Sequence, residues 1–223
     1  MRWQPIALSQ LAAKQSIAEG ALHVWWWPEH LQPVATTRRG RTDAILRTLL
    51  ARYLLVDPDA LRFGREPKGR PFLLHADAPD FNLSDTTGGC VLAVTTRGRV
   101  GIDIERVDRS PPFARLAPRW FAPDEAAILR ELDADRGRRA FLRLWTAKEA
   151  SCKATGTGIF GRLATWRFAI GTDASAPQVL GLPPEAGAAD RWRFHRIAPT
   201  PSHTVALACQ GTVAQPLGYV VVD

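Results

Sequence analysis

Cysteine is scarce in this sequence. Cys90, Cys152 and Cys209 are the only three among 223 residues. An odd number of widely separated cysteines fits neither a disulfide framework nor a zinc site, because both need cysteines at paired or short spacings. We therefore expect reduced, partly buried thiols, which excludes the class of small disulfide-stapled domains.

Long apolar runs are also missing. No segment reaches the roughly 20 consecutive apolar residues that a membrane-spanning helix needs, and residues 1–15 lack the apolar centre of a signal peptide. We expect no membrane association and a cytoplasmic location. Low-complexity tracts are absent too, and the length allows one large domain or two small ones.

Acidic residues are outnumbered by basic ones, 22 to 29, which gives a formal net charge of +7. Most arginines of the N-terminal third fall in two segments, residues 36–52 and 61–72. Such clusters suit phosphate groups, nucleic acid or an acidic protein partner, although solvated helix faces explain the charge equally well. Charge alone leaves these possibilities open.

The hydrophobic pattern divides the chain into two halves of similar content. In the first half it predicts a strand at 21–28, a helix around 45–54, and two strands within 90–107 joined by a hairpin turn at Arg97-Gly98. In the second half it predicts helices at 123–132 and 136–156, strands at 163–170, 191–198, 203–209 and 217–223, and a loop at 171–190. We predict an α+β fold with two similar subdomains, residues 1–101 and 102–223, each a small antiparallel sheet packed against a long helix.

Two carboxylates interrupt the predicted strand in GRVGIDIERVD, residues 98–108. Asp103 and Glu105 are two residues apart, so they lie on the same strand face, opposite to Ile102 and Ile104. Side by side they repel each other and resist desolvation unless they find water or a cation. A half-exposed strand face would satisfy them as well, so this pair alone does not distinguish a structural from a functional role.

A third carboxylate, Glu149, lies in the apolar stripe of the predicted helix 136–156, alongside Leu142 and Trp145. A carboxylate there is costly without a cation. Lys148 shares the stripe, and Lys153 follows Glu149 at i+4, where a simple surface pair would gain about 0.2–0.5 kcal/mol. That pair explains Lys153 but not the position of Glu149 among large apolar side chains.

The three carboxylates together indicate a metal site. Oxygen ligands without an accompanying histidine or cysteine cluster are typical of a hard cation. Mg²⁺ takes few carboxylates and completes its octahedron with water and substrate phosphates. The sequence therefore predicts a metal that bridges protein carboxylates to a phosphorylated substrate.

Four ordered motifs carry a resemblance to a known family. The motifs are K-G-R-P at 68–71, F-N-L-S at 81–84, G-I-D-I-E at 101–105 and W-T-A-K-E-A at 145–150. With the tryptophan-rich strand and the basic helix before them, they resemble the Sfp-type 4′-phosphopantetheinyl transferases. These enzymes move the phosphopantetheine arm of coenzyme A onto a serine of a carrier protein. The resemblance implies a pseudo-twofold pair of subdomains with coenzyme A in the cleft between them.

The resemblance also implies roles for individual residues. The Mg²⁺ ligands would be Asp103, Glu105 and Glu149. The residues that contact coenzyme A would be Arg41, Arg65, Arg70, Asn82, Ser84 and Lys153. The catalytic residues would be Glu149 and Lys153: the carrier serine loses its proton to Glu149, directly or through water, and attacks the β-phosphorus, while Lys153 offsets charge on the departing 3′,5′-ADP. The partner would be an apo acyl or peptidyl carrier protein, usually acidic, and the enzyme a pseudo-dimeric monomer.

One residue departs from the family pattern. The family typically reads F-N-x-S-H, in which the histidine contacts the 3′-phosphate of coenzyme A, whereas Asp85 follows Ser84 here. An aspartate repels a phosphate. A homologue with altered recognition of coenzyme A is therefore one alternative.

A basic nucleic-acid-binding module is the alternative from another class. Its arginines would contact phosphates, and the tryptophans of VWWWP, residues 24–28, would stack on bases if exposed. This function gives no role to three carboxylates in apolar settings. We therefore favour the transferase and expect no nucleic-acid partner.

Overall fold

The computed structural model describes residues 1–11, 15–171 and 175–223. The helices are α1 (Arg38–Leu54), α2 (Phe113–Trp120), α3 (Pro123–Arg130) and α4 (Ala134–Thr155). The strands are β1 (Trp3–Ala7), β2 (Leu22–Pro28), β3 (Phe63–Arg65), β4 (Pro71–Leu73), β5 (Asp80–Thr86), β6 (Gly89–Thr95), β7 (Arg99–Arg106), β8 (Arg167–Phe168), β9 (Val179–Gly181), β10 (Trp192–Ile197), β11 (His203–Gln210) and β12 (Pro216–Val222). None of the helices in these ranges has both the length and the apolar character that crossing a membrane requires.

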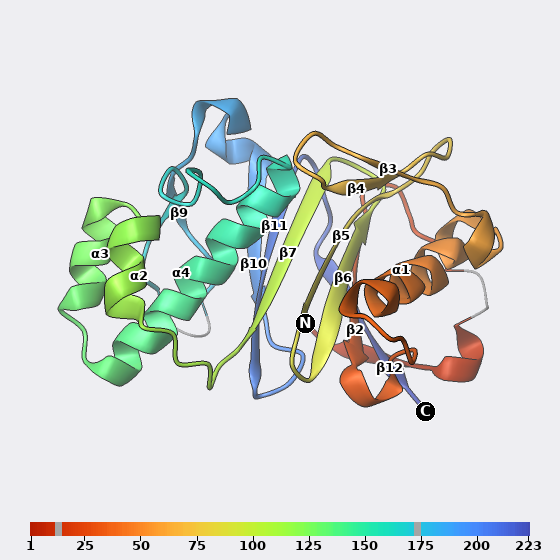
Figure 1. Ribbon diagram of the computed structural model, residues 1–223. Coiled ribbons are helices and arrows are strands. Elements are labelled where there is room, and N and C mark those ends of the chain that lie inside the picture. Colours follow the sequence, from red (N-terminus) through yellow and green to blue (C-terminus); the bar gives the residue numbers. More distant parts are fainter. Residues whose placement is uncertain (12–14, 172–174) are drawn as a thin grey trace.

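Two sheets form the centre of the molecule (Figure 1). The larger sheet has the strand order β1-β12-β2-β6-β5, and the smaller one has the order β10-β11-β7. Strand β12 is the last in the chain, yet it pairs in parallel with β1 and β2 of the larger sheet. The smaller sheet is antiparallel throughout. The predicted α+β class is confirmed, but the larger sheet is mixed rather than antiparallel because the chain returns to it at its end.

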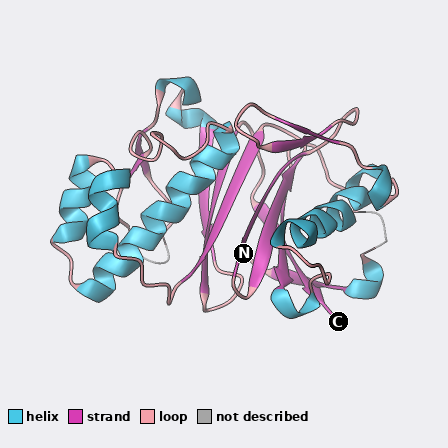
Figure 2. Ribbon diagram, in the orientation of Figure 1, coloured by secondary structure: helices cyan, strands magenta, loops and turns pink. Residues whose placement is uncertain are grey.

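Alternation of side chains along the strands explains how the layers pack. Trp25 and Trp27 of β2 pack with α1, whereas Val24 and Trp26 lie in the core between the two sheets, together with β7. Helix α4 covers the other face of the smaller sheet. The helices therefore lie on the two outer sides, with the strands between them (Figure 2). Because all three tryptophans are buried, they offer no surface for stacking on bases.

The two sheets meet at their edge strands, β5 and β7. Asp80 Oδ2 accepts a hydrogen bond from the backbone nitrogen of Val100 at 2.8 Å, and Asn82 Oδ1 accepts one from Ile102 at 2.9 Å. Polar side chains at alternate positions of β5 thus satisfy backbone donors of β7 that no strand pairs. The junction is polar, and it lies beside the predicted Asp103.

The predicted helix at 136–156 is confirmed as α4, which ends at Gly156 in the left-handed conformation with φ 71°. The predicted hairpin at Arg97-Gly98 is wrong, because β6 pairs with β2 and β5 while β7 pairs with β11. The strand predicted at 163–170 shortens to Arg167–Phe168, since the chain turns there and its carbonyl groups face helix α4.

Within the expected loop at 171–190, Val179–Gly181 forms β9, and residues 172–174 lie outside the described ranges. The subdomain boundary after residue 101 stays a prediction.

Candidate active site

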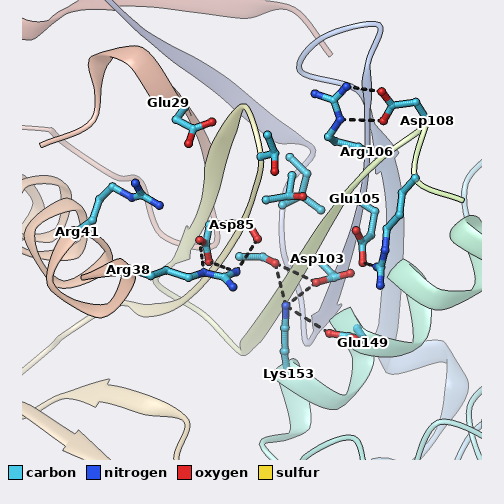
Figure 3. Close-up of a pocket in the computed structure, with 15 residues that line it drawn as sticks. Glu29, Arg38, Arg41, Asp85, Asp103, Glu105, Arg106, Asp108, Glu149 and Lys153 are labelled. Carbon is cyan, nitrogen blue, oxygen red and sulfur yellow. Dashed lines mark hydrogen bonds and ion pairs between the residues drawn. The ribbon is translucent and has the colours of Figure 1, made fainter. Parts of the chain in front are cut away.

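A cleft of about 700 Å³ opens where the two sheets meet, between the start of α1 and the C-terminal half of α4 (Figure 3). Six of the residues predicted from the sequence line it: Arg41, Ser84, Asp103, Glu105, Glu149 and Lys153. They come from α1, β5, β7 and α4. The fold therefore gathers side chains from four separate elements at the junction of the sheets.

Close packing of α4 on β7 places the carboxylates of both elements in the cleft. Gly101 permits this approach, since a Cβ at that position would lie 2.0 Å from the carbonyl oxygen of Ala150. Ile102 and Ile104 face the core between the sheets, so Asp103 and Glu105 point to the α4 side. The shared strand face predicted from the two-residue spacing is thus the one that meets α4.

Lys153 is the centre of a polar cluster in this cleft. Its Nζ lies 2.6 Å from Asp103 Oδ1 and 3.7 Å from Glu149 Oε2, and it donates to Ser84 Oγ at 2.9 Å. Ser84 in turn donates to Asp103 Oδ1 at 2.9 Å. Burial alone would lower the pKa of Lys153, but the charges of Asp103 and Glu149 outweigh it and raise the pKa above its ordinary value. Lys153 is therefore protonated and positively charged at neutral pH.

Glu105 and Glu149 lie in surroundings that disfavour their charged forms. Burial is the larger cause and the negative charge of Asp103 the second, and together they raise the pKa of each carboxyl to about 7. Arg109 pairs with Glu105 and opposes the shift. A further cation near these carboxylates would stabilise their ionised forms.

The donor set suits a hard cation. Asp103 is 4% exposed, and its Oδ2 is buried with no hydrogen-bond partner in the described ranges. Such an unsatisfied carboxylate oxygen is costly unless something binds it. Among the described residues no three His, Cys, Asp or Glu side chains form a ready metal centre, and Asp103 and Glu105 are instead paired with Lys153 and Arg109. The residues fit Mg²⁺ by donor type, with Asp103 Oδ2 as the unsatisfied atom.

The cleft wall also contains an ion pair that the sequence did not predict. Arg38 donates to the two carboxylate oxygens of Asp85, from Nε at 2.6 Å and from Nη2 at 2.9 Å, and Nη2 also donates to the Asp85 carbonyl at 3.0 Å (Figure 3). The two residues are 47 positions apart in the sequence, so no local pattern connects them. The available signal was the doubled arginine at 38 and 39, just where the helix begins. Arg109, which pairs with Glu105, was missed as well.

The remaining predicted residues lie outside the cleft. Arg65 and Asn82 line a neighbouring groove of about 1120 Å³ that shares Arg38 with the cleft. Arg70 is 7% exposed and makes a two-pronged pair with Asp80 at 3.0 and 2.8 Å. Its Nε donates to the Lys153 carbonyl at 2.8 Å. Arg70 thus supports the end of α4 from behind the cleft.

The carboxylate–lysine cluster beside arginines is a set of side chains that suits a divalent cation and a phosphate-bearing ligand. A model of the 4′-phosphopantetheinyl transferase superfamily matches residues 99–208, the segment that carries the carboxylates and Lys153. The 4′-phosphopantetheinyl transferase HetI of Nostoc is 38% identical over 156 residues, 68% of this chain and 64% of that protein. The 4′-phosphopantetheinyl transferase Sfp of Bacillus subtilis is 31% identical over 119 residues, 52% of this chain and 51% of that protein. The chain is therefore similar to this superfamily, which agrees with the resemblance found in the four motifs.

These alignments span about half to two thirds of the relatives' own length. Among solved structures, that of Thermotoga maritima holo-[acyl-carrier-protein] synthase is similar over 51% of this chain and 63% of that chain, with 24% identity and a TM-score of 0.39.

Proposed function

We propose that this protein is a 4′-phosphopantetheinyl transferase. It moves the phosphopantetheine arm of coenzyme A onto a serine of an acyl or peptidyl carrier protein and releases 3′,5′-ADP. The observation that carries the proposal is the cleft itself, in which the three predicted carboxylates, Lys153 and two arginines of α1 face one cavity, in a chain that is similar to this superfamily. The similarity to this superfamily favours this function over a nucleic-acid-binding module, whose tryptophans would have to be exposed.

Asp103, Glu105 and Glu149 are the proposed ligands of Mg²⁺. The unpartnered Oδ2 of Asp103 supports this assignment. When bound, the ion would neutralise the diphosphate of coenzyme A and fix its orientation. Lys153 and Arg109, which pair with Asp103 and Glu105, would supply positive charge to the phosphate oxygens.

The chain's own residues position the reacting groups and handle the proton. Glu149 Oε2 accepts the proton of the carrier serine, whose oxygen forms a bond to the β-phosphorus. The bond between that phosphorus and the oxygen of 3′,5′-ADP breaks, and Lys153 Nζ offsets the charge that develops on the leaving phosphate. Of the other proposed contacts to coenzyme A, Arg41 and Ser84 face the cleft, and Arg65 and Asn82 face the neighbouring groove.

Intact-mass measurement tests the transfer. The protein is incubated with Mg²⁺, coenzyme A and several apo carrier proteins, and each carrier is expected to gain the mass of one phosphopantetheine group. Asp103→Ala and Glu149→Ala should abolish the gain, whereas Asp108→Ala should not, because Asp108 lines the same cleft but is exposed and paired with Arg106. No gain with any carrier would overturn the proposed function.

Thermal unfolding tests the metal site without relying on activity. Saturating Mg²⁺ should raise the unfolding temperature of the wild-type protein by several degrees, since a ligand at about 100 times its Kd stabilises by about 2.7 kcal/mol. A chelator should reverse the shift, and Asp103→Asn should remove it. An equal shift in Asp103→Asn would contradict the assigned ligands. We propose a cytoplasmic location and a monomeric state. The three cysteines are free and buried, as expected for reduced thiols.

A further inference from the structure

Arg38 and Asp85 form an ion pair with more hydrogen bonds than a single surface contact. Three donated hydrogen bonds join them, two to the carboxylate and one to the Asp85 carbonyl. The Arg38 side chain nevertheless stays 68% exposed, while that of Asp85 is 22% exposed. The pair thus fixes the direction of a guanidinium group and leaves much of that group open.

The hydrogen bonds use only one edge of the guanidinium group. Arginine has five N–H donors in a planar fork. Nε–H and the two N–H groups of Nη2 are committed to Asp85, whereas Nη1 has no partner among the residues that the structure describes. The two N–H groups of Nη1 therefore remain for an acceptor in the cleft that Arg38 lines.

The position of Arg38 on α1 is unfavourable for the helix itself. Arg38, Arg39 and Arg41 all lie in the first turn, which contains no acidic residue. Positive charge at a helix N-terminus opposes the helix dipole, by roughly 0.3–1 kcal/mol for each exposed charge. The pair with Asp85 offsets part of this cost at Arg38, and an anion beside the three arginines would be favoured by their charge and by the helix end alike.

We propose that Asp85 is a positioning residue for Arg38, and that Arg38 binds the phosphate of coenzyme A that lies away from the diphosphate, the 3′-phosphate. The inference rests on the proposed function for the identity of the ligand. If the diphosphate lies at the carboxylate end of the cleft, the 3′-phosphate is the one anionic group of coenzyme A left for the arginine end. Asp85 then does not repel the ligand directly, because Arg38 neutralises the charge of Asp85 and binds the phosphate through Nη1, away from the aspartate.

A binding experiment separates positioning from repulsion. Calorimetry without metal compares adenosine 3′,5′-bisphosphate with adenosine 5′-monophosphate, which lacks only the 3′-phosphate. Wild-type protein should prefer the bisphosphate by about tenfold or more, the range expected for charge-assisted hydrogen bonds. Arg38→Ala should remove that preference without changing affinity for the monophosphate. Arg38→Lys should keep only part of it, because a point charge lacks the fork.

Asp85→Ala decides between the two roles of the aspartate. Loss of positioning should weaken binding of the bisphosphate by about three- to tenfold, because Arg38 is no longer held and must be ordered by the ligand. Asp85→Asn should fall between, since its amide oxygen still accepts one hydrogen bond. Tighter binding in Asp85→Ala would overturn the inference, because it would show that the aspartate repels the ligand. Arg97→Ala, which breaks a similarly exposed pair with Glu19 far from the cleft, is the matched control and should change neither affinity.

Steady-state kinetics provide the second readout. With coenzyme A, Arg38→Ala and Asp85→Ala should raise KM and leave kcat within about twofold, as expected for loss of uniform binding. With 3′-dephospho-coenzyme A both variants should match the wild type. If the wild type transfers from both substrates with equal KM, the inference fails and the proposed function stands. If adenosine 3′,5′-bisphosphate is preferred but no carrier is modified, the proposed function fails and the phosphate contact stands.

Discussion

Helix α4 carries two lysines in opposite settings, Lys148 and Lys153. Lys148 is fully buried, with its Nζ 2.6 Å from Glu125 Oε2, and it donates to the carbonyl groups of Leu163 and Trp166. Lys153 is 25% exposed and faces Asp103, one oxygen of which has no partner among the described residues. The first cluster is closed, because its polar atoms satisfy one another, whereas the second is open.

The two settings shift the pKa values of the two lysines in opposite directions. Burial is the main cause that lowers the pKa of Lys148, despite its pairing with Glu125. The carboxylates around Lys153 raise its pKa instead. Glu125 also accepts hydrogen bonds from the backbone nitrogens of Ala122 and Phe168 at 3.0 and 2.9 Å, so each of its carboxylate oxygens has a partner. A closed polar cluster specifies the fold, and an open one keeps charge available for a ligand.

Breaking the closed cluster should have the largest effect on stability. Lys148→Met leaves the Glu125 charge buried without its cation, so we expect the free energy of unfolding to fall by about 3–5 kcal/mol. Urea unfolding followed by circular dichroism measures this change. The double variant Lys148→Met with Glu125→Gln should recover part of the loss, since the glutamine is neutral. A loss below 1 kcal/mol in the single variant would mean that the pair is not closed to water.

Arg70 belongs to a closed cluster that contacts the end of α4, next to the open cluster around Lys153. It binds Asp80 and the carbonyl groups of Lys153, Phe81 and Val100, so Arg70→Met leaves several buried acceptors unpaired. We expect a loss of about 2–4 kcal/mol in the free energy of unfolding. Carrier modification should also slow, because the end of α4 that holds Lys153 loses its support. Unchanged stability with a raised KM for coenzyme A would instead favour the phosphate contact that the sequence predicts for Arg70.

Local patterns in the sequence predicted much of the site. The two-residue spacing of Asp103 and Glu105 fixed their shared face, because strand alternation is a local property. The i+4 relation of Glu149 and Lys153 and the stop at Gly156 are equally local. These features put four of the cleft residues on two elements before any tertiary contact is known.

Long-range contacts could not be predicted in the same way. The hairpin expected at Arg97-Gly98 is wrong because β7 finds its partner in β11, about 100 residues later. The strand expected at 163–170 is largely lost because Lys148 takes the carbonyl groups of that segment. Arg38 and Asp85 are joined only by the packing of α1 beside β5, so a sequence pattern made Asp85 look simply repulsive.

A second closed cluster, around His23, should give a smaller, pH-dependent effect. His23 is 3% exposed and lies 3.0 Å from Tyr53 Oη, and burial lowers its pKa from 6.5 to about 4. Between these values the unfolded chain binds the proton more strongly, so stability is full above pH 6.5 and falls as the pH drops towards 4. We expect His23 to contribute about 1–3 kcal/mol to this fall. Urea unfolding at pH 7 and 4.5 should show a smaller difference in His23→Gln than in the wild type, with exposed His30→Gln as the control.

Lys153→Met should have the smallest effect on stability. Asp103 Oδ1 keeps the hydrogen bond from Ser84, and water can enter the cleft to solvate the carboxylates, so the loss should stay below about 1 kcal/mol. The same substitution at Lys148 of this helix is its matched control in the urea experiment. Carrier modification should nevertheless fall strongly in Lys153→Met, because the charge on the leaving phosphate is no longer offset. If both substitutions destabilise the protein equally, the cleft around Lys153 is as closed as the core around Lys148, and the contrast between them is wrong.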